Sequence, residues 1–422
     1  MRFLRIGIYV LAAFGILAFG AVEDWARAVV EVAAGLLFLA WAIRAYFLRE
    51  QQIVISPLLL PLLAFLLVVL AQWLFRLTAS SYATRIDFAL LIADSLLLFL
   101  AVQAFRSLDD WRGFVWFVMS LGFFVALFGI LQHLTFNGKL YWFREMRFGG
   151  IPFGPYVNRN HFAGFMELVI PVSLVPLVLG KVRRERWFLV SLFAVVPIGA
   201  LFFSASRGGI ISFALEVAVL LLWLILRRTA AKHLLSGGAV LLLAFLMVSW
   251  LGVRQAIERF SSMQALEVTS GKRASMAADT WRIFLERPLL GAGLGTLQIV
   301  FPRYETHYDG KIVNHSHNDY LEALAETGIA GGLCCCWFLG SLFFHSIRKI
   351  SQPSSAFAST LQLSALVSCL GFLTHSLVDF NLHIPGNALL FFLVANLAAS
   401  EIRSPGSPIP KMELTRNDSR KH

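Results

Sequence analysis

Residues 55–75 read ISPLLLPLLAFLLVVLAQWLF, a run without a single charged side chain. A helix needs about 20 apolar residues to cross the hydrocarbon core of a bilayer, because each residue advances the helix by about 1.5 Å. Similar runs recur along the whole chain of 422 residues, of which 58% are hydrophobic and 14% are charged. Together with a mean hydropathy of +0.72, this composition predicts an integral membrane protein.

The apolar runs predict an all-α polytopic membrane protein with about twelve transmembrane helices. The first run follows basic residues as a secretory signal would, but it opens a series of such runs and is better interpreted as a transmembrane helix. We expect residues 1–403 to form a single membrane domain and residues 404–422 to be a disordered cytoplasmic tail. The helices are expected near residues 5–22, 26–47, 55–75, 86–105, 112–135, 161–180, 187–203, 210–227, 234–253, 327–346, 361–378 and 386–400.

Basic clusters orient this array in the membrane. With the amino terminus inside, the clusters at residues 181–186, 227–228 and 348–349 all face the cytoplasm, as the positive-inside rule requires. Two outer segments are long, residues 137–160 and a large loop at residues 254–326. Both are rich in Lys and Arg, which suits an anionic ligand. Within the large loop, residues 280–286 have the spacing of a short amphipathic helix.

Charge and cysteine usage exclude two other classes of site. The net charge of +11 resides in short segments between apolar runs, with no basic face carrying interleaved aromatic residues, so nucleic acid is not an expected partner. The cysteines Cys334, Cys335, Cys336 and Cys369 all lie inside apolar runs. They are therefore interpreted as small packing residues rather than as a disulfide framework or a zinc site.

The densest polar cluster is His315-Ser316-His317-Asn318-Asp319-Tyr320, just before an apolar run. Imidazoles, an amide and a carboxylate at the edge of a low-dielectric phase supply proton donors and acceptors, which predicts an active site. For Asn318 and Asp319, helix capping is the alternative role. Metal binding is not expected, because the chain contains no HExxH or other spaced ligand set.

Two further segments carry candidate anion ligands. In Ser206-Arg207-Gly208-Gly209, an arginine lies in a short turn between apolar runs, and the glycines let backbone N–H groups approach the same ligand. Alternatively, the Arg207 guanidinium reaches lipid headgroups or pairs with Glu216. Arg273, ahead of the amphipathic segment, is a second candidate, and simple solvation is its alternative.

Polar residues also mark two helix boundaries. Asn158, Asn160 and His161 enter one helix, where they either meet a polar substrate or serve only as a cap, for which Asn160 suffices. His375, Asp379, Asn381 and His383 follow the penultimate run. His375 and Asp379 share a face if their helix continues that far, as an internal pair or part of a site, and the role of this cluster stays open.

These residues resemble the O-antigen ligase and polymerase family of bacterial membrane glycosyltransferases. Three elements carry the resemblance in order: the Ser206–Gly209 turn; Arg273 with Trp281 and the segment from Arg287-Pro288 to Gly293; and His317-Asn318 followed, after nine residues, by Gly328-Ile329-Ala330-Gly331. The matching region runs from about residue 154 to 331. The resemblance implies a glycosyltransferase of the GT-C-like class in the bacterial inner membrane, with its active site facing the periplasm.

The resemblance further implies transfer of a glycan from undecaprenyl pyrophosphate to an acceptor hydroxyl of lipid A core, a growing polysaccharide or a protein, with inversion and without metal or cofactor. His317 is the implied general base, because imidazole titrates near neutrality. Arg207 and Arg273 would stabilise the leaving pyrophosphate. The implied substrate-binding residues are Ser206, Gly208, Asn158, Asn160, His161, His315, Asn318, Asp319 and Arg287.

The sequence leaves several alternatives open. It does not separate ligase from polymerase or from protein O-glycosylation, and it does not identify the donor glycan, the acceptor or the oligomeric state. A transporter of an ion or a lipid-linked saccharide is the rival function, with Asp94, Glu216, His375 and Asp379 as intramembrane ion-binding residues. The concentration of polar residues at one face, without paired broken helices, favours the enzyme.

Overall fold

The computed structural model describes residues 1–47, 53–145, 151–227, 231–251, 270–308 and 310–403, and the expected tail at 404–422 lies outside them. All regular structure in these residues is helical. The helices are α1 (Arg2–Leu17), α2 (Asp24–Phe47), α3 (Leu59–Leu74), α4 (Ser81–Ala104), α5 (Leu108–Leu134), α6 (Arg159–Val178), α7 (Arg184–Ser204), α8 (Arg207–Leu226), α9 (Ala231–Leu251), α11 (Ser270–Glu286), α12 (Leu297–Val300), α13 (Asp319–Ser351), α14 (Ala356–His375) and α15 (Pro385–Ala399), with short 3-10 turns η1 (Phe19–Ala21), η3 (Phe301–Arg303) and η4 (Asn381–His383).

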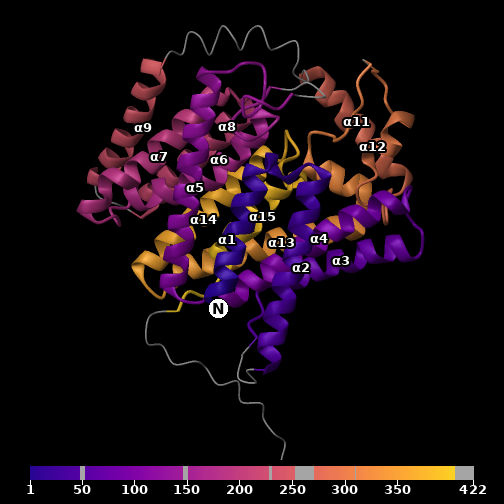
Figure 1. Ribbon diagram of the computed structural model, residues 1–422, viewed down its shortest axis with the longest axis horizontal. Coiled ribbons are helices and arrows are strands. Elements are labelled where there is room, and N and C mark those ends of the chain that lie inside the picture. Colours follow the sequence, from indigo (N-terminus) through magenta and orange to yellow (C-terminus); the bar gives the residue numbers. More distant parts are fainter. Residues whose placement is uncertain (48–52, 146–150, 228–230, 252–269, 309, 404–422) are drawn as a thin grey trace, which may run out of the picture.

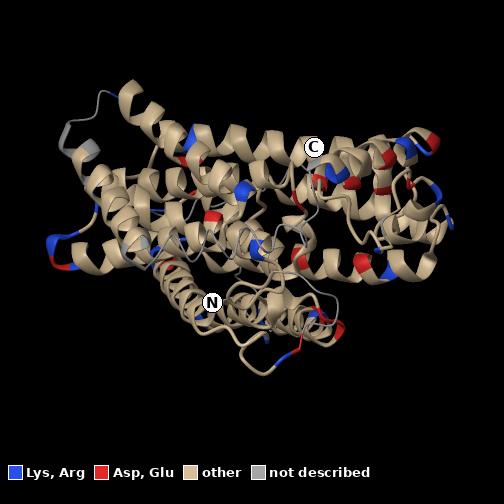
Figure 2. Ribbon diagram, turned by 90° about the horizontal axis from the view of Figure 1, so that it is seen from above, with Lys and Arg blue, Asp and Glu red and all other residues tan. Residues whose placement is uncertain are grey.

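Every range expected to span the membrane overlaps one of these helices. Eight helices in the described part of the chain are long and apolar enough to cross a bilayer, namely α2, α4, α5, α6, α7, α8, α13 and α14. Charged residues rarely interrupt the helical ribbons (Figure 2). The all-α, multi-pass membrane class is thereby confirmed, whereas the number of twelve spans stays a prediction.

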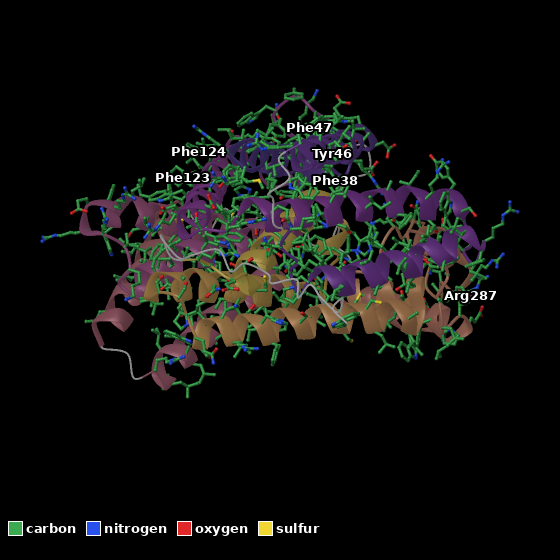
Figure 3. The ribbon with its side chains drawn as sticks, turned by 90° about the horizontal axis from the view of Figure 1, so that it is seen from below. Phe38, Tyr46, Phe47, Phe123, Phe124 and Arg287 are labelled. Carbon is green, nitrogen blue, oxygen red and sulfur yellow. The ribbon has the colours of Figure 1, made fainter. Side chains whose placement is uncertain are left out.

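Exposed apolar side chains show where lipid would cover the bundle. Phe47, Tyr46 and Phe124 are among the large hydrophobic residues that are more than half exposed (Figure 3). A soluble protein rarely exposes so much contiguous apolar surface, because water makes it costly. The outer faces of these helices therefore suit hydrocarbon rather than water.

Helix α6 forms the centre of the bundle. All of its residues are buried, and it packs against α14, α7 and α5 (Figure 1). Gly122 permits the approach of α5, because a Cβ at this position would clash with Val169 of α6. The first turn of α6 contains Asn160 and His161. Because the helix is enclosed on all sides, these two residues are held in a fixed position.

The segments that connect the helices lie at two opposite ends of the bundle. At one end, Arg403 pairs by backbone hydrogen bonds with Arg106 and Leu108, both at 3.2 Å, and Lys349 Nζ lies 3.9 Å from Glu401 Oε2. These are segments that the basic clusters assign to the cytoplasm. At the opposite end lie the beginnings of α6, α8 and α13 and the end of α14. The candidate site residues belong to that second group.

Two helices in the large loop, α11 and the start of α13, begin earlier in the sequence than expected. The amphipathic helix is longer than residues 280–286, because α11 already begins at Ser270. Its apolar face, Met276 and Ile283, packs into a small core with Phe301, Val313 and Ala325. The end of the loop is also helical, since α13 begins at Asp319 rather than near residue 327. The loop is therefore folded onto the first turns of α13.

Gly328 breaks α13 shortly after its start. Its φ of 63° and ψ of −164° are not helical, and a Cβ there would clash with the backbone of Leu289. The Ile329 and Ala330 N–H groups freed by this break donate to the carbonyls of Pro288 (2.7 Å) and Leu289 (3.1 Å). In return, Gly293 N–H donates to Glu326 O at 2.8 Å. The segment from Arg287 to Gly293 and the segment from Gly328 to Gly331 are therefore joined by backbone hydrogen bonds, which gives both motifs a structural role.

Candidate functional site

Asp379 is the point at which the candidate residues converge. It is fully buried in the turn after α14. Asn160 Nδ2 donates to its Oδ2 at 2.6 Å, and the Phe380 N–H donates to its Oδ1 at 2.9 Å. His317 Nδ1 lies 3.4 Å and His161 Nε2 3.8 Å from Oδ1, while Arg273 Nη2 lies 3.9 Å from Oδ2. One carboxylate therefore links α6, α11 and the loop that precedes α13.

The first turn of α6 presents Asn160 because another residue caps the helix. Asn158, not Asn160 as expected, is the N-cap, and its side chain accepts from Asn160 N–H at 2.9 Å. The Asn160 side chain is thus free to reach Asp379, and its Oδ1 accepts from Ser206 Oγ at 2.9 Å. Ser206 in turn caps α8 by accepting from Gly209 N–H. A chain of hydrogen bonds therefore fixes the start of α8 relative to Asp379.

His317 lies at the partly exposed edge of this arrangement. Its side chain is 13% exposed, and its φ of 54° is in the left-handed region, which non-glycine residues adopt only when neighbouring contacts hold them there. Asn318, the N-cap of α13, supplies such a contact, because its Nδ2 donates to Leu377 O at 2.9 Å. The Asp319 N–H also donates to Ser376 O. Both bonds fasten His317 beside the turn that carries Asp379.

The electrostatic surroundings keep Asp379 charged. Burial alone would raise the pKa of its carboxyl group, but the hydrogen bond with His317 and the charges of the His317, His161 and His375 imidazoles hold that pKa well below its usual range. An ionised carboxylate beside Nδ1 favours a proton on that nitrogen. The other ring nitrogen of His317, Nε2, is then the one able to accept a proton.

The two predicted anion ligands, Arg273 and Arg207, lie on either side of the turn after α14 that contains Asp379. Arg273 of α11 donates from Nη1 to Val378 O at 3.1 Å and is 26% exposed. Arg207 is the first residue of α8 and is exposed. A Cβ on its neighbour Gly208 would lie 2.6 Å from the His375 ring and 3.2 Å from Val378. Glycine thus lets the start of α8 pack directly against the end of α14.

Arg287 is not part of this group. It is exposed, lies at the edge of the molecule, and its charge acts on Tyr304 (Figure 3). No contact between Arg287 and the Asp379 group is present among the described residues. The expectation that Arg287 joins the other site residues is therefore not met by the structure, and its role in binding stays a prediction.

A second polar cluster lies on the other side of Phe380. His315 stacks on this ring with centroids 4.3 Å apart, and the ring edge also meets His161 and His317. His315 Nδ1 lies 2.7 Å from Glu322 Oε1, and His383 Nδ1 lies 2.7 Å from Asp319 Oδ1. Burial lowers the pKa of His383, but the charge of Glu322 and the hydrogen bond that the imidazole donates to Asp319 raise it to about 10.

The expected His375–Asp379 helical face is absent, because α14 ends at His375. His375 instead lies with its Nδ1 2.8 Å from Glu167 Oε1 in the bundle interior. No role is predicted for Phe380 or Glu322 from the sequence, and Asp379 is placed there only in a polar cluster of open role or among the ion-binding residues of a transporter. The spacing of carboxylates and histidines after residue 374 was the available signal for Asp379, whereas nothing in the sequence pointed to Phe380.

Residues 192–336 match a family model described as O-antigen ligase. This region, about a third of the chain, is similar to that family. No curated protein matches the chain at a significant level. The matched residues include Ser206, Arg207, Arg273 and His317, so the resemblance inferred from the motifs is confirmed. Asn160 and Asp379 lie outside them, and the candidate site thus combines the matched region with the helices on either side.

Proposed function

We propose that this protein transfers a glycan from undecaprenyl pyrophosphate to an acceptor hydroxyl on the periplasmic face of the bacterial inner membrane. Similarity to the O-antigen ligase family supports a glycosyltransferase that uses lipid-linked donors. The observation that carries the proposal is the contact between His317 and the buried carboxylate of Asp379, at 3.4 Å and beside Arg273. This combination supplies a base and a cation at one partly exposed edge.

His317 is the proposed general base. Asp379 orients the imidazole through Nδ1, so that Nε2 removes the proton from the acceptor hydroxyl as its oxygen attacks the anomeric carbon. The new glycosidic C–O bond forms while the bond from that carbon to the pyrophosphate oxygen breaks. A single displacement of this kind inverts the anomeric configuration. The proton ends on His317, and the electron pair leaves with the lipid pyrophosphate.

Arg207 and Arg273 are the proposed partners of the leaving group. The pyrophosphate gains negative charge as the bond breaks, and guanidinium groups bind phosphate oxygens through two parallel hydrogen bonds. Arg207 also stands at the amino-terminal end of α8, where the helix dipole favours an anion. These fixed positive charges remove the need for a metal ion in the transfer step.

The remaining candidates have supporting roles in the proposal. Asn160 positions Asp379 through its 2.6 Å hydrogen bond, and Ser206 positions Asn160. His161 and His315 both contact the Phe380 ring, with centroids 4.7 Å and 4.3 Å from it, and are proposed to bind the substrate there. Lipid A core, a growing polysaccharide and a protein all present hydroxyl groups and are all compatible with this chemistry.

A transporter of an ion or a lipid-linked saccharide is the second candidate, supported by buried ionisable residues inside the bundle. His375 and Glu167 lie 2.8 Å apart in the interior, and Glu216 is buried against Gly371 of α14. Such residues often mark ion or proton pathways in membranes. They lie on α6, α8 and α14, the same helices whose ends meet at the Asp379 group.

Purified protein in detergent tests the two functions against each other. The protein is mixed with an undecaprenyl-pyrophosphate-linked glycan and an acceptor saccharide, and the glycosylated acceptor is measured by mass spectrometry. Transfer in detergent, where no membrane gradient exists, is the expected result for the enzyme. Absence of transfer, together with movement of the lipid-linked glycan across vesicles containing the protein, would establish the transporter instead.

A further inference from the structure

His315, Glu322 and His383 form a compact group of ligand-type side chains. One ligand atom from each residue lies within 4.8 Å of the others. Glu322 Oε1 lies 2.7 Å from His315 Nδ1 and 3.4 Å from His383 Nε2. The three residues come from separate segments: the loop before α13, the first turn of α13, and η4. Their convergence therefore depends on the tertiary fold.

The two oxygens of Glu322 have different surroundings. The side chain is only 1% exposed, so its charge requires compensation within the protein. Oε2 accepts from Ser316 N–H at 2.8 Å and from Ser316 Oγ at 3.1 Å. Oε1 lies against imidazole nitrogens of His315 and His383, the same atoms that could serve as metal ligands. One oxygen of the carboxylate is thus held by the Ser316 donors, and the other lies beside the two histidines.

Asp319 sets the orientation of the His383 ring. Its Oδ1 lies 2.7 Å from His383 Nδ1, and its Oδ2 accepts from Leu382 N–H at 3.0 Å. The opposite ring nitrogen, Nε2, is thereby directed at Glu322. A carboxylate that holds the far nitrogen of a histidine is the usual outer partner of a metal-binding imidazole, because it fixes the tautomer and raises the basicity of the ligand.

We propose that His315, Glu322 and His383 bind a divalent transition-metal ion of the zinc type. Two imidazoles and one carboxylate are a ligand set that zinc accepts in proteins, with a water molecule in the fourth position. Ligand atoms about 2.0–2.2 Å from a common tetrahedral ion are roughly 3.3 Å apart. Small side-chain rotations therefore suffice to open the closest contact and to bring in the most distant atom.

The ion would act on the position of the proposed base rather than on the transfer step. It would link the loop that carries His315 and His317 to η4, which follows Asp379 and Phe380. Phe380 already stacks on His315 and touches His317 with centroids 5.0 Å apart. A bound ion would thus hold both walls of the His317–Asp379 contact. This inference does not depend on the proposed function, because its test measures metal binding.

The test uses the full chain in detergent, purified with an affinity tag that lacks histidine. After removal of metal with a chelator and exchange into chelator-free buffer, zinc alone is added and the retained metal is measured by mass spectrometry. We expect one zinc per chain and a higher unfolding temperature. Glu322→Gln and His383→Ala should each lower zinc affinity at least tenfold, since even the loss of an outer partner of a metal ligand typically costs 10- to 100-fold.

The matched control is His345→Ala, which removes a histidine at the distant end of the same helix. His345 Nδ1 lies 2.8 Å from Ser341 O and contacts none of the proposed ligands among the described residues. Zinc binding should survive this change. Wild-type protein that retains no zinc, or ligand variants that retain as much zinc as wild type, would overturn the proposal and leave the cluster as a hydrogen-bonded His–Glu–His contact. Glu322→Gln preserves side-chain shape and keeps the test valid if His383→Ala fails to fold.

Discussion

Nδ1 of His317 lies 3.4 Å from Oδ1 of Asp379, although the two residues are far apart in the sequence. The contact joins a loop inside residues 192–336, which match the O-antigen ligase family model, to a turn beyond them. It is maintained by hydrogen bonds on both sides, from Asn318 to Leu377 and from Asn160 to Asp379.

Removing the charge of Asp379 should make His317 a poorer base while leaving the imidazole in the protein. Asp379→Asn keeps the shape of the side chain but no longer favours a proton on His317 Nδ1, so we expect transfer to fall about 10²- to 10⁴-fold. The rate is measured with purified protein at equal concentration. Asp109→Asn is the control and should leave the rate unchanged, because the Asp109 side chain is exposed at the start of α5 and its Oδ1 lies 2.7 Å from Arg112 Nη1. Near-normal turnover by Asp379→Asn would show that the imidazole needs no carboxylate partner.

Asp379 should also make stability depend on pH in acid. The surrounding histidines hold its pKa below the ordinary carboxyl value of about 4. A depressed pKa contributes stability that is present above the unfolded-state value and is lost as the pH falls towards the folded-state value. Thermal unfolding measured between about pH 6 and pH 3 should therefore show a steeper loss for wild type than for Asp379→Asn. Parallel curves would contradict the assigned charge state.

Lysine in place of either candidate arginine separates charge from geometry. Arg207→Lys and Arg273→Lys retain the cation but lose the planar fork, and we expect each to lose most transfer activity while inserting normally. Arg282→Lys is the control, because this residue of α11 pairs with Asp279 and not with the Asp379 turn. Full activity of Arg207→Lys would mean that Arg207 is a headgroup anchor.

The side of the membrane is tested by reporter fusions. The basic clusters predict that a reporter fused after Arg186 reads as cytoplasmic and that one fused near Asp309 reads as periplasmic. Comparable expression of both fusions is the control. A cytoplasmic reading at Asp309 would put the candidate site on the side opposite to the proposed donor lipid, and the proposed mechanism would fail.

Gly328 should be intolerant of substitution for backbone reasons. Alanine there must adopt a φ of 63°, and its Cβ would clash with Leu289, so we expect Gly328→Ala to destabilise the protein by at least ~1–3 kcal/mol. Gly340→Ala in the same helix is the matched control, because a Cβ at that position meets nothing within 4 Å. Unfolding temperatures of the two variants would be compared. Equal unfolding temperatures for the two variants would show that the break in α13 at Gly328 does not stabilise the fold.

The helices were predictable because each spanning segment must be free of charge over about 20 residues, a local property of the sequence. Their bounds shifted where side-chain caps decide them, as Asn158 does for α6. Gly328 was recognised as part of a motif, but its function as a helix break depends on Pro288 and Leu289, which only the fold brings near. The role of the motif glycines in docking could not be derived from their spacing.

The candidate site was predicted in part. His317, Arg207 and Arg273 stand out as polar residues in apolar surroundings, and the structure brings them to the same turn. Asp379 could not be assigned, because its partners Asn160 and His317 reach it from other segments and the hydrogen bond from Asn160 joins residues 219 positions apart. Contacts over such distances depend on packing of α6 against α14, which no local pattern reveals.

The central claim is that His317 accepts the proton of the acceptor hydroxyl, and its most direct test compares the two neighbouring histidines. Transfer by purified His317→Ala and His315→Ala is measured with a lipid-linked glycan and its acceptor, at matched protein levels. We expect His317→Ala to lose about 10²- to 10⁴-fold in rate and His315→Ala to lose much less. Turnover by His317→Ala at the wild-type rate would contradict the account.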